Sequence, residues 1–214
     1  EDLLEYFRLA KGPSLEPRYN IAPSQDVAAV RQVGNERQMV LLHWGLIPFW
    51  AEDPKIGYRT LNARAETAHK APAFRAAFRG RRCLIPASAF FEWDKKGGSK
   101  QPFFIHRADG RPMAFAGLWE KWHDKEGKSV IESCTILTTD ANETVGKLHN
   151  RMPVILAPEN FDLWLDPATI SIERLSPLLH PAREGILIMY PVSTYVNKVT
   201  NEGERCIEPV EEKG

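Results

Sequence analysis

The sequence predicts an α+β fold: one domain over residues 1–214, with a curved, barrel-like and mostly antiparallel β-sheet core and helices at its periphery. Short aromatic or β-branched runs, separated by turn residues, crowd the middle of the chain. They do not alternate regularly with helical segments, as they would in a parallel α/β sheet. No Gly-rich phosphate loop follows a strand, which argues against a Rossmann-type architecture. The length suits one large domain, and the 43% apolar content supports a substantial core.

The N-terminal part of the chain is predicted to contain a helix, two strands and a second, interrupted helix. Residues 2–10 carry apolar side chains on one side of a short helix. Residues 27–31 and 39–46 have the composition of strands. Residues 66–78 have a helical composition, and Pro72 must interrupt that helix because it has no N–H to donate.

The rest of the chain begins with a dense β region and then mixes helices with single strands. Five strands are predicted at residues 82–86, 90–94, 102–106, 113–119 and 130–138. Hairpin turns are predicted at Lys96-Gly97-Gly98 and Ala108-Asp109-Gly110. The remaining elements are helices at residues 140–148, 158–165 and 171–179, and strands at residues 154–156 and 186–192.

Composition limits the classes of protein that this chain can be. Lys and Arg number 28 and Asp and Glu number 28, so any nucleic-acid binding needs a local basic groove rather than an overall charge. No apolar run approaches the roughly 20 residues that span a bilayer, and the acidic start is unlike a signal peptide. We therefore expect a cytoplasmic protein. The three widely spaced cysteines are expected to be free buried thiols in a reducing cytosol, and we expect no metal and no cofactor.

Residues 61–67 (LNARAET) place an amide, a guanidinium and a carboxylate close together, on Asn62, Arg64 and Glu66. The aromatic run WGLIPFW at residues 44–50 lies upstream and offers stacking surfaces. Such a combination is typical of a binding site. The alternative is a helix start, with Asn62 as the cap and Glu66 in the first turn against the helix dipole.

Two further residues could transfer protons. Glu92 lies in an aromatic strand, and alternation puts it on the face opposite Phe91 and Trp93. On the concave side of a barrel it would suit general acid or base catalysis, whereas on the outer side it would simply face solvent. His149 is expected in a loop beside Arg151, either as a proton-transfer group with an anion-binding partner or as a structural hydrogen-bonding residue. No Ser/His/Asp order, metal-binding helix or Walker-type loop is present.

Taken in order, eight motifs resemble the SOS response-associated peptidase (SRAP) family, whose members process abasic sites in single-stranded DNA. The resemblance runs over nearly the whole chain, and the joint order of the motifs is highly specific. The matching segments are RYNIAP (18–23), WGLIPFW (44–50), NARAET (62–67), RCLIP (82–86), FEW (91–93), QPFFI (101–105), HNRMP (149–153) and PVS (191–193) with Val196-Asn197.

The resemblance implies covalent chemistry on DNA. In the family, the α-amine of an N-terminal Cys attacks the aldehyde of the abasic site, and its thiol closes a thiazolidine ring. An α-amine with a pKa near 8 is partly neutral and nucleophilic at pH 7. Carried over by position, Asn62 would orient the N-terminal residue and the sugar, while Glu92 and His149 would handle protons. DNA contacts would come from Arg64, Arg151, Phe49, Trp50, Asn20, Pro23 and Thr138.

The chain departs from the family pattern at three points. Phe49 replaces one of two Trp and keeps a stacking face, and Ala89 replaces the usual Gly before the aromatic pair. The larger departure is that no Cys lies near residue 1. We expect that a short N-terminal segment with the nucleophile is absent from the sequence. The alternative is a truncated paralogue that forms no crosslink.

We therefore expect an abasic-site crosslinking enzyme of the DNA damage response that also processes its own N-terminus. It would act as a monomer on single-stranded DNA, without an obligate protein partner, and associate with the nucleoid when bound to DNA. Two alternatives remain: a non-covalent binder of single strands or junctions, and a conventional cysteine peptidase. The lack of an evident Cys-His pair argues against the peptidase.

Overall fold

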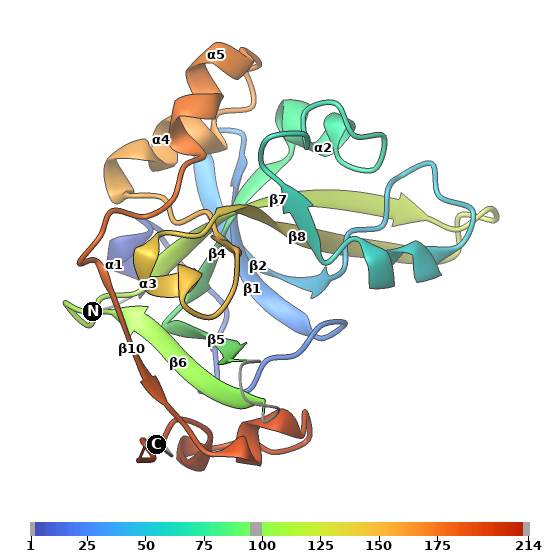
Figure 1. Ribbon diagram of the computed structural model, residues 1–214. Coiled ribbons are helices and arrows are strands. Elements are labelled where there is room, and N and C mark those ends of the chain that lie inside the picture. The colour runs from blue at the N-terminus through green and yellow to red at the C-terminus, as the bar shows by residue number, and fades with distance from the viewer. Residues whose placement is uncertain (1–2, 95–99, 212–214) are drawn as a thin grey trace.

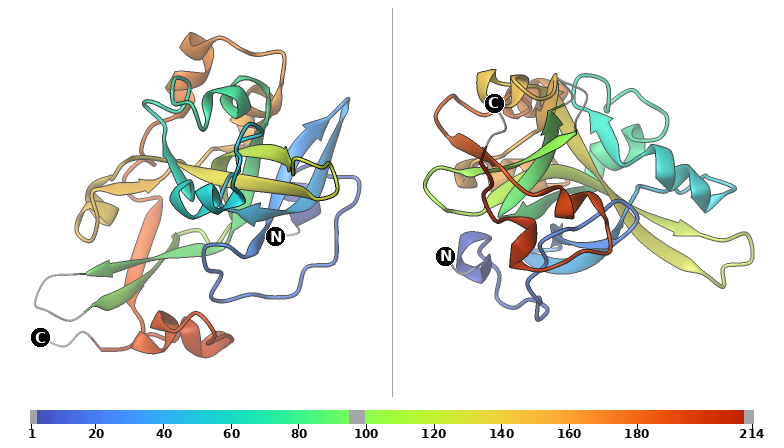
Figure 2. Two further views of the ribbon diagram at one scale, coloured as in Figure 1. Left: turned by 90° about the vertical axis from the view of Figure 1, so that its right-hand side faces the viewer. Right: turned by 60° about the horizontal axis from the view of Figure 1, so that its bottom comes forward.

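The computed structural model describes residues 3–94 and 100–211 (Figures 1 and 2). Its centre is a closed barrel of five strands in the order β2-β1-β4-β7-β8, in which β8 pairs again with β2. The neighbours along this order are antiparallel, and the closing β2–β8 pair is parallel. The α+β barrel prediction is confirmed. The barrel strands are β1 (Asp26–Val33), β2 (Glu36–Trp44), β4 (Arg82–Ala87), β7 (Met113–His123) and β8 (Val130–Asp140).

Two short strands extend the barrel along β8. The strand β3 (Asn62–Arg64) runs parallel to β8, and β9 (Arg151–Pro153) runs antiparallel to it. The alternative of Asn62 as a helix cap is wrong, because the backbone of this segment is hydrogen-bonded to β8. The Ile136 N–H donates to the Leu61 carbonyl, and the Ala65 N–H donates to the Thr138 carbonyl. β3 therefore pairs with β8 beyond the end of β2, and a long connection joins the two strands.

The predicted helix at residues 66–78 is mostly wrong. Only α2 (Arg75–Gly80) is helical, and the residues before it form successive turns in which Ala68 N–H donates to Arg64 and Lys70 N–H donates to Thr67. Pro72 supplies no N–H, so these turns do not join into one helix.

A second sheet of three antiparallel strands covers one side of the barrel. Its order is β10-β6-β5, and Phe90 packs edge-to-face on Phe115 of β7 with ring centroids 5.9 Å apart. The face of this sheet that is turned away from the barrel carries a row of aromatic side chains. The C-terminal segment covers them with its 3-10 turns η4 (Thr194–Asn197) and η5 (Glu204–Cys206). The hairpin turn predicted at Lys96-Gly97-Gly98 lies outside the described residues. The strands are β5 (Ala89–Asp94), β6 (Gln101–Arg107) and β10 (Leu187–Pro191).

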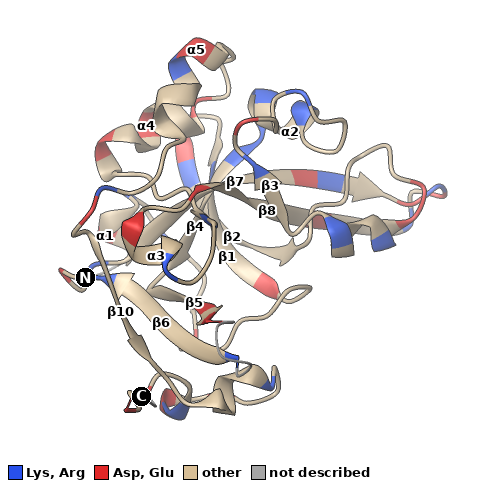
Figure 3. Ribbon diagram, viewed as in Figure 1, with Lys and Arg blue, Asp and Glu red and all other residues tan. Residues whose placement is uncertain are grey.

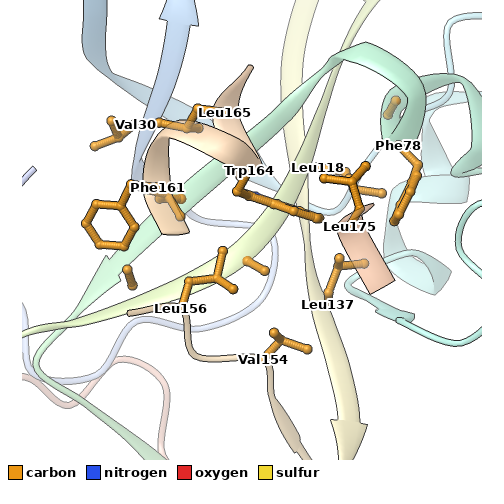
Figure 4. Close-up of a cluster of buried hydrophobic side chains, with 14 of the residues drawn as sticks. Val30, Phe78, Leu118, Leu137, Val154, Leu156, Phe161, Trp164, Leu165 and Leu175 are labelled. Carbon is orange, nitrogen blue, oxygen red and sulfur yellow. The ribbon is translucent and has the colours of Figure 1, made fainter. Parts of the chain in front are cut away.

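The protein has two main hydrophobic cores, one on each side of the barrel wall. The inner core fills the barrel and continues to the small sheet. The outer core lies between the barrel and the peripheral helices, with Trp164 and Phe161 fully buried (Figure 4). The helices predicted at residues 2–10 and 140–148 are shorter than predicted, as α1 (Leu3–Tyr6) and α3 (Glu143–Gly146). Those predicted at 158–165 and 171–179 are present, each divided between an α-helix and a 3-10 turn: η2 (Pro158–Asn160) with α4 (Phe161–Leu165), and α5 (Ile172–Leu175) with η3 (Ser176–Leu178). The 3-10 turn η1 (Pro54–Arg59) was not predicted.

A buried arginine joins β4 to the outer helices. The Arg82 guanidinium lies over the Trp164 ring and donates to five backbone carbonyls, those of Trp164, Phe78, Arg79, Asp166 and Thr169. Burial lowers the pKa of Arg82 to about 10. Because buried carbonyl groups need hydrogen-bond donors, this one side chain supplies donors to the backbone carbonyls near the ends of α2 and α4. No helix in the described part of the chain is long and apolar enough to cross a membrane.

Candidate nucleic-acid interface

The segment that connects β2 to β3 (residues 45–61) begins and ends at nearly the same place on the barrel. β2 ends at Trp44 against Cys134, and β3 resumes two residues further along the same strand β8. The backbones of Gly45 and Gly57 touch there. A Cβ on Gly45, whose φ is 140°, would lie 2.6 Å from the Gly57 carbonyl oxygen. Only glycine fits such a position, which explains the residue at 45.

Side chains also hold the base of this segment together. The Thr60 hydroxyl donates to the Leu46 carbonyl at 2.6 Å, and Trp44 Nε1 donates to the Leu61 carbonyl at 2.9 Å. Further out, Trp122 Nε1 of β7 donates to the Ala51 carbonyl at 2.7 Å. The segment is thus a clamped Ω-type loop on the barrel, not a loose connection. We call residues 45–61 the Ω segment.

Three aromatic side chains of the Ω segment are exposed: Phe49 is 56% exposed, Trp50 50% and Tyr58 66%. Large exposed aromatic groups on a clamped backbone are typical of a binding surface. Lys55 and Arg59 are exposed on η1 beside Tyr58. Figure 3 shows Lys and Arg on this segment, on β3 and around α2, on the same side of the molecule.

Asn62 and Arg64 face the inner side of the barrel near its mouth. Ala63 between them belongs to the outer core, so alternation turns its two neighbours the other way, like Ile136 and Thr138 opposite them. Both side chains are exposed. Within the described part of the chain, Arg64 makes no ion pair or hydrogen bond through its guanidinium. Its charge is therefore available to a ligand.

Glu92 lies on the side of the small sheet that faces the barrel. Phe90 packs on Phe115 of the barrel, and alternation places Glu92 on the same face, opposite Phe91 and Trp93. Trp93 lies on the other side and donates to Asn197 at 2.7 Å. Glu92 is half-buried. The strand that carries Glu92 belongs to the small sheet rather than to the barrel.

His149 is fixed by its own backbone. It follows α3, whose first turn is capped by Asn142, and His149 N–H donates to the Val145 carbonyl. The Arg151 N–H donates to Nδ1 of the ring at 3.1 Å. Nδ1 also lies 3.2 Å from the Arg151 carbonyl oxygen, so the backbone of Arg151 holds the ring in either tautomer.

Arg151 is the centre of an ion-pair network. It binds both oxygens of Glu66 at 2.9 and 2.8 Å, Asp140 at 2.8 Å and the Thr138 carbonyl at 2.7 Å. The hydrogen bonds from Arg151 lower the pKa of Glu66, and the same contact raises the pKa of Arg151. This guanidinium ties β8, β9 and the turn after β3 together. Two carboxylates already balance its charge, unlike that of Arg64.

Asn20 is an anchor. It is buried, and its Nδ2 donates to the carbonyls of Val196, Lys198 and Asn201 at 3.1–3.2 Å. Its amide nitrogen is therefore committed to protein. Pro23 is exposed three residues later, and the following residue, Ser24, donates its N–H to the Trp44 carbonyl. Asn20 thus holds the segment that carries Pro23 toward the base of the Ω segment.

The residues that the sequence indicated divide into three groups. Asn62, Arg64, Thr138 and Arg151 lie on β3, β8 and β9, which are joined by backbone pairing, and His149 lies two residues before β9. Phe49 and Trp50 lie in the Ω segment, and Pro23 lies at its base on the segment that the buried Asn20 holds. Glu92 comes from the small sheet. Sequence reasoning missed Tyr58, Lys55 and Arg59, although an aromatic residue between two cations was a readable signal.

Comparison with known proteins agrees with this geometry. Residues 1–199 match the family described as SOS response associated peptidase (SRAP). The chain is 41% identical to the abasic site processing protein YoqW of Bacillus subtilis, over 97% of this chain and 94% of the relative. It is 32% identical to the abasic site processing protein HMCES of Gallus gallus, over 94% of this chain and 64% of that protein.

A solved structure shares the fold. A crystal structure of a protein from Bacteroides thetaiotaomicron superimposes with a TM-score of 0.80 at 28% identity, covering 88% of this chain and 82% of that one. The motifs, the barrel and the family match therefore agree. The chain belongs to the SOS response associated peptidase (SRAP) family.

Proposed function

We propose that this protein processes abasic sites in single-stranded DNA and crosslinks to them covalently. The observation that carries the proposal is the placement of Asn62 and Arg64 at the barrel mouth, with Glu92 directed toward the barrel from the small sheet. An amide, a cation without a hydrogen-bonded partner among the described residues and a half-buried carboxylate suit a sugar, a phosphate and a proton transfer respectively. The relatives named as abasic site processing proteins support action on abasic sites.

DNA would follow the surface between β3 and the Ω segment. Arg64 binds a phosphate next to the lesion, because its guanidinium has no partner in the described structure. Phe49 and Trp50 stack on bases, with Pro23 beside them, at about 1–3 kcal/mol per stacked base. Arg151 reaches the DNA beside Thr138 and keeps this edge in shape through Glu66 and Asp140.

The nucleophile in this proposal is an N-terminal cysteine carried ahead of Glu1. Its amine condenses with the aldehyde of the ring-opened sugar, water leaves, and its thiol adds to the imine carbon to close a thiazolidine. The three cysteines of the sequence do not suit this role. All three are fully buried, and burial raises the pKa of each thiol. A buried protonated thiol is a poor nucleophile.

Glu92 and His149 move the protons. Ring opening and imine formation each need a proton delivered to or removed from an oxygen of the sugar. Both contacts of Nδ1 are with the backbone of Arg151, so Nε2 is the ring nitrogen that serves the proton transfer. Asn62, exposed at the mouth, orients the sugar and the incoming amine. The peptidase name of the family corresponds, in this proposal, to removal of the initiator residue that exposes the amine.

The test uses the protein with its natural N-terminus and a single-stranded oligonucleotide that carries one abasic site. A band that survives a denaturing gel is expected. It should disappear with a tetrahydrofuran analogue, which has no aldehyde, and on replacement of the N-terminal Cys by Ser. Glu92→Gln and His149→Ala should slow the reaction at least 10-fold, as is usual for general acid–base groups, while the exposed His180→Ala serves as a matched control.

Two outcomes would overturn parts of the proposal. Tight binding of the analogue with no covalent band on the abasic oligonucleotide would leave a non-covalent single-strand binder. Normal rates in both Glu92→Gln and His149→Ala would remove the proton-transfer roles. A conventional cysteine peptidase built on the three cysteines of the sequence is disfavoured, because none of their thiols reaches the surface.

A further inference from the structure

We propose that η1 of the Ω segment forms a second stacking site for single-stranded DNA, at which an unpaired base lies on Tyr58 and the backbone phosphate binds Lys55. This inference rests on the proposed function and extends its DNA path. Neither Tyr58 nor Lys55 belongs to the motifs that identify the family.

A cavity lies beside Tyr58. Its volume is about 170 Å³, and its lining includes Ile47, Ile131 and His43 as well as Tyr58 and Lys55. Ile47 is buried and forms an apolar floor. Tyr58 is 66% exposed, so most of the ring is uncovered and can take a base against its face. Among the residues that the structure describes, none that lines this cavity is acidic, which suits a polyanion.

The cavity continues into a wider hollow. His43 and Ile131 line both, and the hollow has a volume of about 750 Å³. It exists because β2 and β8 pair over only two residues, at His43 and Trp44, and diverge upstream (Figure 1). The strand leaving the stacking site therefore has an open path. Lys121 lies in this path together with two acids, Glu132, whose carboxylate is balanced by Arg31 at 3.0 Å, and Asp26.

Charge and rigidity favour a nucleotide as the occupant. Lys55 and Arg59 are exposed on the same turn, and neither side chain has a partner among the described residues. The two acids that precede this turn each have a contact: Asp53 accepts the Lys55 N–H as the cap of η1, and Glu52 faces Lys125 at 3.9 Å. Because the base of the Ω segment is clamped, Tyr58 is held in place, and stacking costs little ordering of the protein.

The site lies on the same segment of the chain as part of the proposed DNA surface. Phe49 and Trp50 lie in the same clamped segment as Tyr58. A single strand that stacks on the first pair can continue over η1, alternating aromatic faces with cations. That alternation is the pattern by which proteins bind single strands without reading their sequence.

The test measures binding of an oligothymidine without abasic sites by fluorescence anisotropy. Tyr58→Leu keeps the bulk but removes the aromatic face and should weaken binding about 5-fold to 100-fold, the equivalent of one lost stacked base. Tyr58→Phe should bind within about 2-fold of the wild type, since the face remains. Lys55→Gln should reduce the slope of log K against log salt by about 0.7. Ile170→Ala and Arg174→Gln, exposed around α5, are the matched controls.

A second readout locates the contact. Oligothymidine with 5-iododeoxyuridine at successive positions is irradiated, and the crosslinked peptide is identified by mass spectrometry. A crosslink to Tyr58 is expected. This inference alone would be overturned if the wild-type protein forms the abasic-site adduct while Tyr58→Leu binds oligothymidine normally and no crosslink appears in residues 54–59. The hollow would then suit an extended peptide instead. A wild-type protein that binds no single-stranded DNA would overturn both proposals.

Discussion

Replacing Gly45 by Ala tests whether the Ω segment is a clamped platform. Gly45 has a φ of 140°, a region that only glycine adopts readily, and its Cβ would lie 2.6 Å from the Gly57 carbonyl oxygen. The strained backbone costs about 1–3 kcal/mol. The steric overlap adds about 1–3 kcal/mol, because the obstructing atom is backbone and cannot rotate away.

The expected total for Gly45→Ala is therefore about 2–6 kcal/mol of lost stability. For a chain of this length, each kcal/mol lowers Tm by about 2–4 °C, so Tm should fall by about 5–20 °C in a calorimetric scan. If the segment relieves the strain by opening locally, the fall is smaller, and new protease cuts appear within residues 46–60.

The matched control is Gly80→Ala. Gly80 is the last residue of α2, its φ is not positive, and no atom lies within 4 Å of its added Cβ. Alanine should be neutral or stabilising there by up to about 1 kcal/mol, since it is the better helix former. An unchanged Tm together with unchanged proteolysis in Gly45→Ala would refute the clamp.

Three further predictions concern the side chains that organise the fold and the site. Arg82→Met leaves five backbone carbonyls without their donor and should cost about 3–5 kcal/mol in urea unfolding; a loss below 1 kcal/mol would contradict the anchoring role. The pKa of Glu66 is lowered from 4.5 by its hydrogen bonds to Arg151, so this carboxylate stabilises the folded state above pH 4.5 and the benefit disappears as the pH falls through the folded-state value. The stability difference between wild type and Glu66→Gln should thus be constant from pH 5 to 8, at no more than about 1 kcal/mol, and shrink below about pH 4; a difference that grows in acid would refute this. Asn20→Ala should raise amide hydrogen exchange in residues 18–23 and 196–201 together, because one side chain joins them; faster exchange in only one segment would show that they are not coupled.

The sequence was sufficient for the β architecture and for part of the site. Most strands in this chain are bounded by turn residues and carry aromatic or β-branched side chains, so their approximate ends follow from local composition. The short strands β3 and β9 were missed, and the strand predicted at residues 154–156 is wrong, because the strand there is β9 at Arg151–Pro153. Alternation alone placed Glu92 opposite Phe91 and Trp93, because successive side chains of a strand point to opposite faces. The motif order predicted the family, which the comparisons confirmed.

Local pattern failed where distant backbone supplied the hydrogen bonds. Residues 62–64 read as a helix start as well as a loop, and they form a strand only because β8 offers its edge. Residues 66–73 have helical composition, yet their backbone N–H groups donate within separate turns, and Pro72 has no N–H to continue a helix. Helix propensity is a weak preference that such tertiary pairing overrides.

By itself, the sequence determined the class of fold, the family and the residue types at the mouth of the barrel, because these depend on local periodicity and motif order. Only the tertiary structure decided which charges remain available. In the structure, Arg151 forms ion pairs with Glu66 and Asp140, whereas Arg64 forms none with a described residue. The amide nitrogen of Asn20 donates its hydrogen bonds to protein carbonyls. The tertiary structure also clamps residues 45–61 so that Tyr58 stands beside a cavity. Such pairings join residues up to 181 positions apart, a distance over which no local pattern carries information.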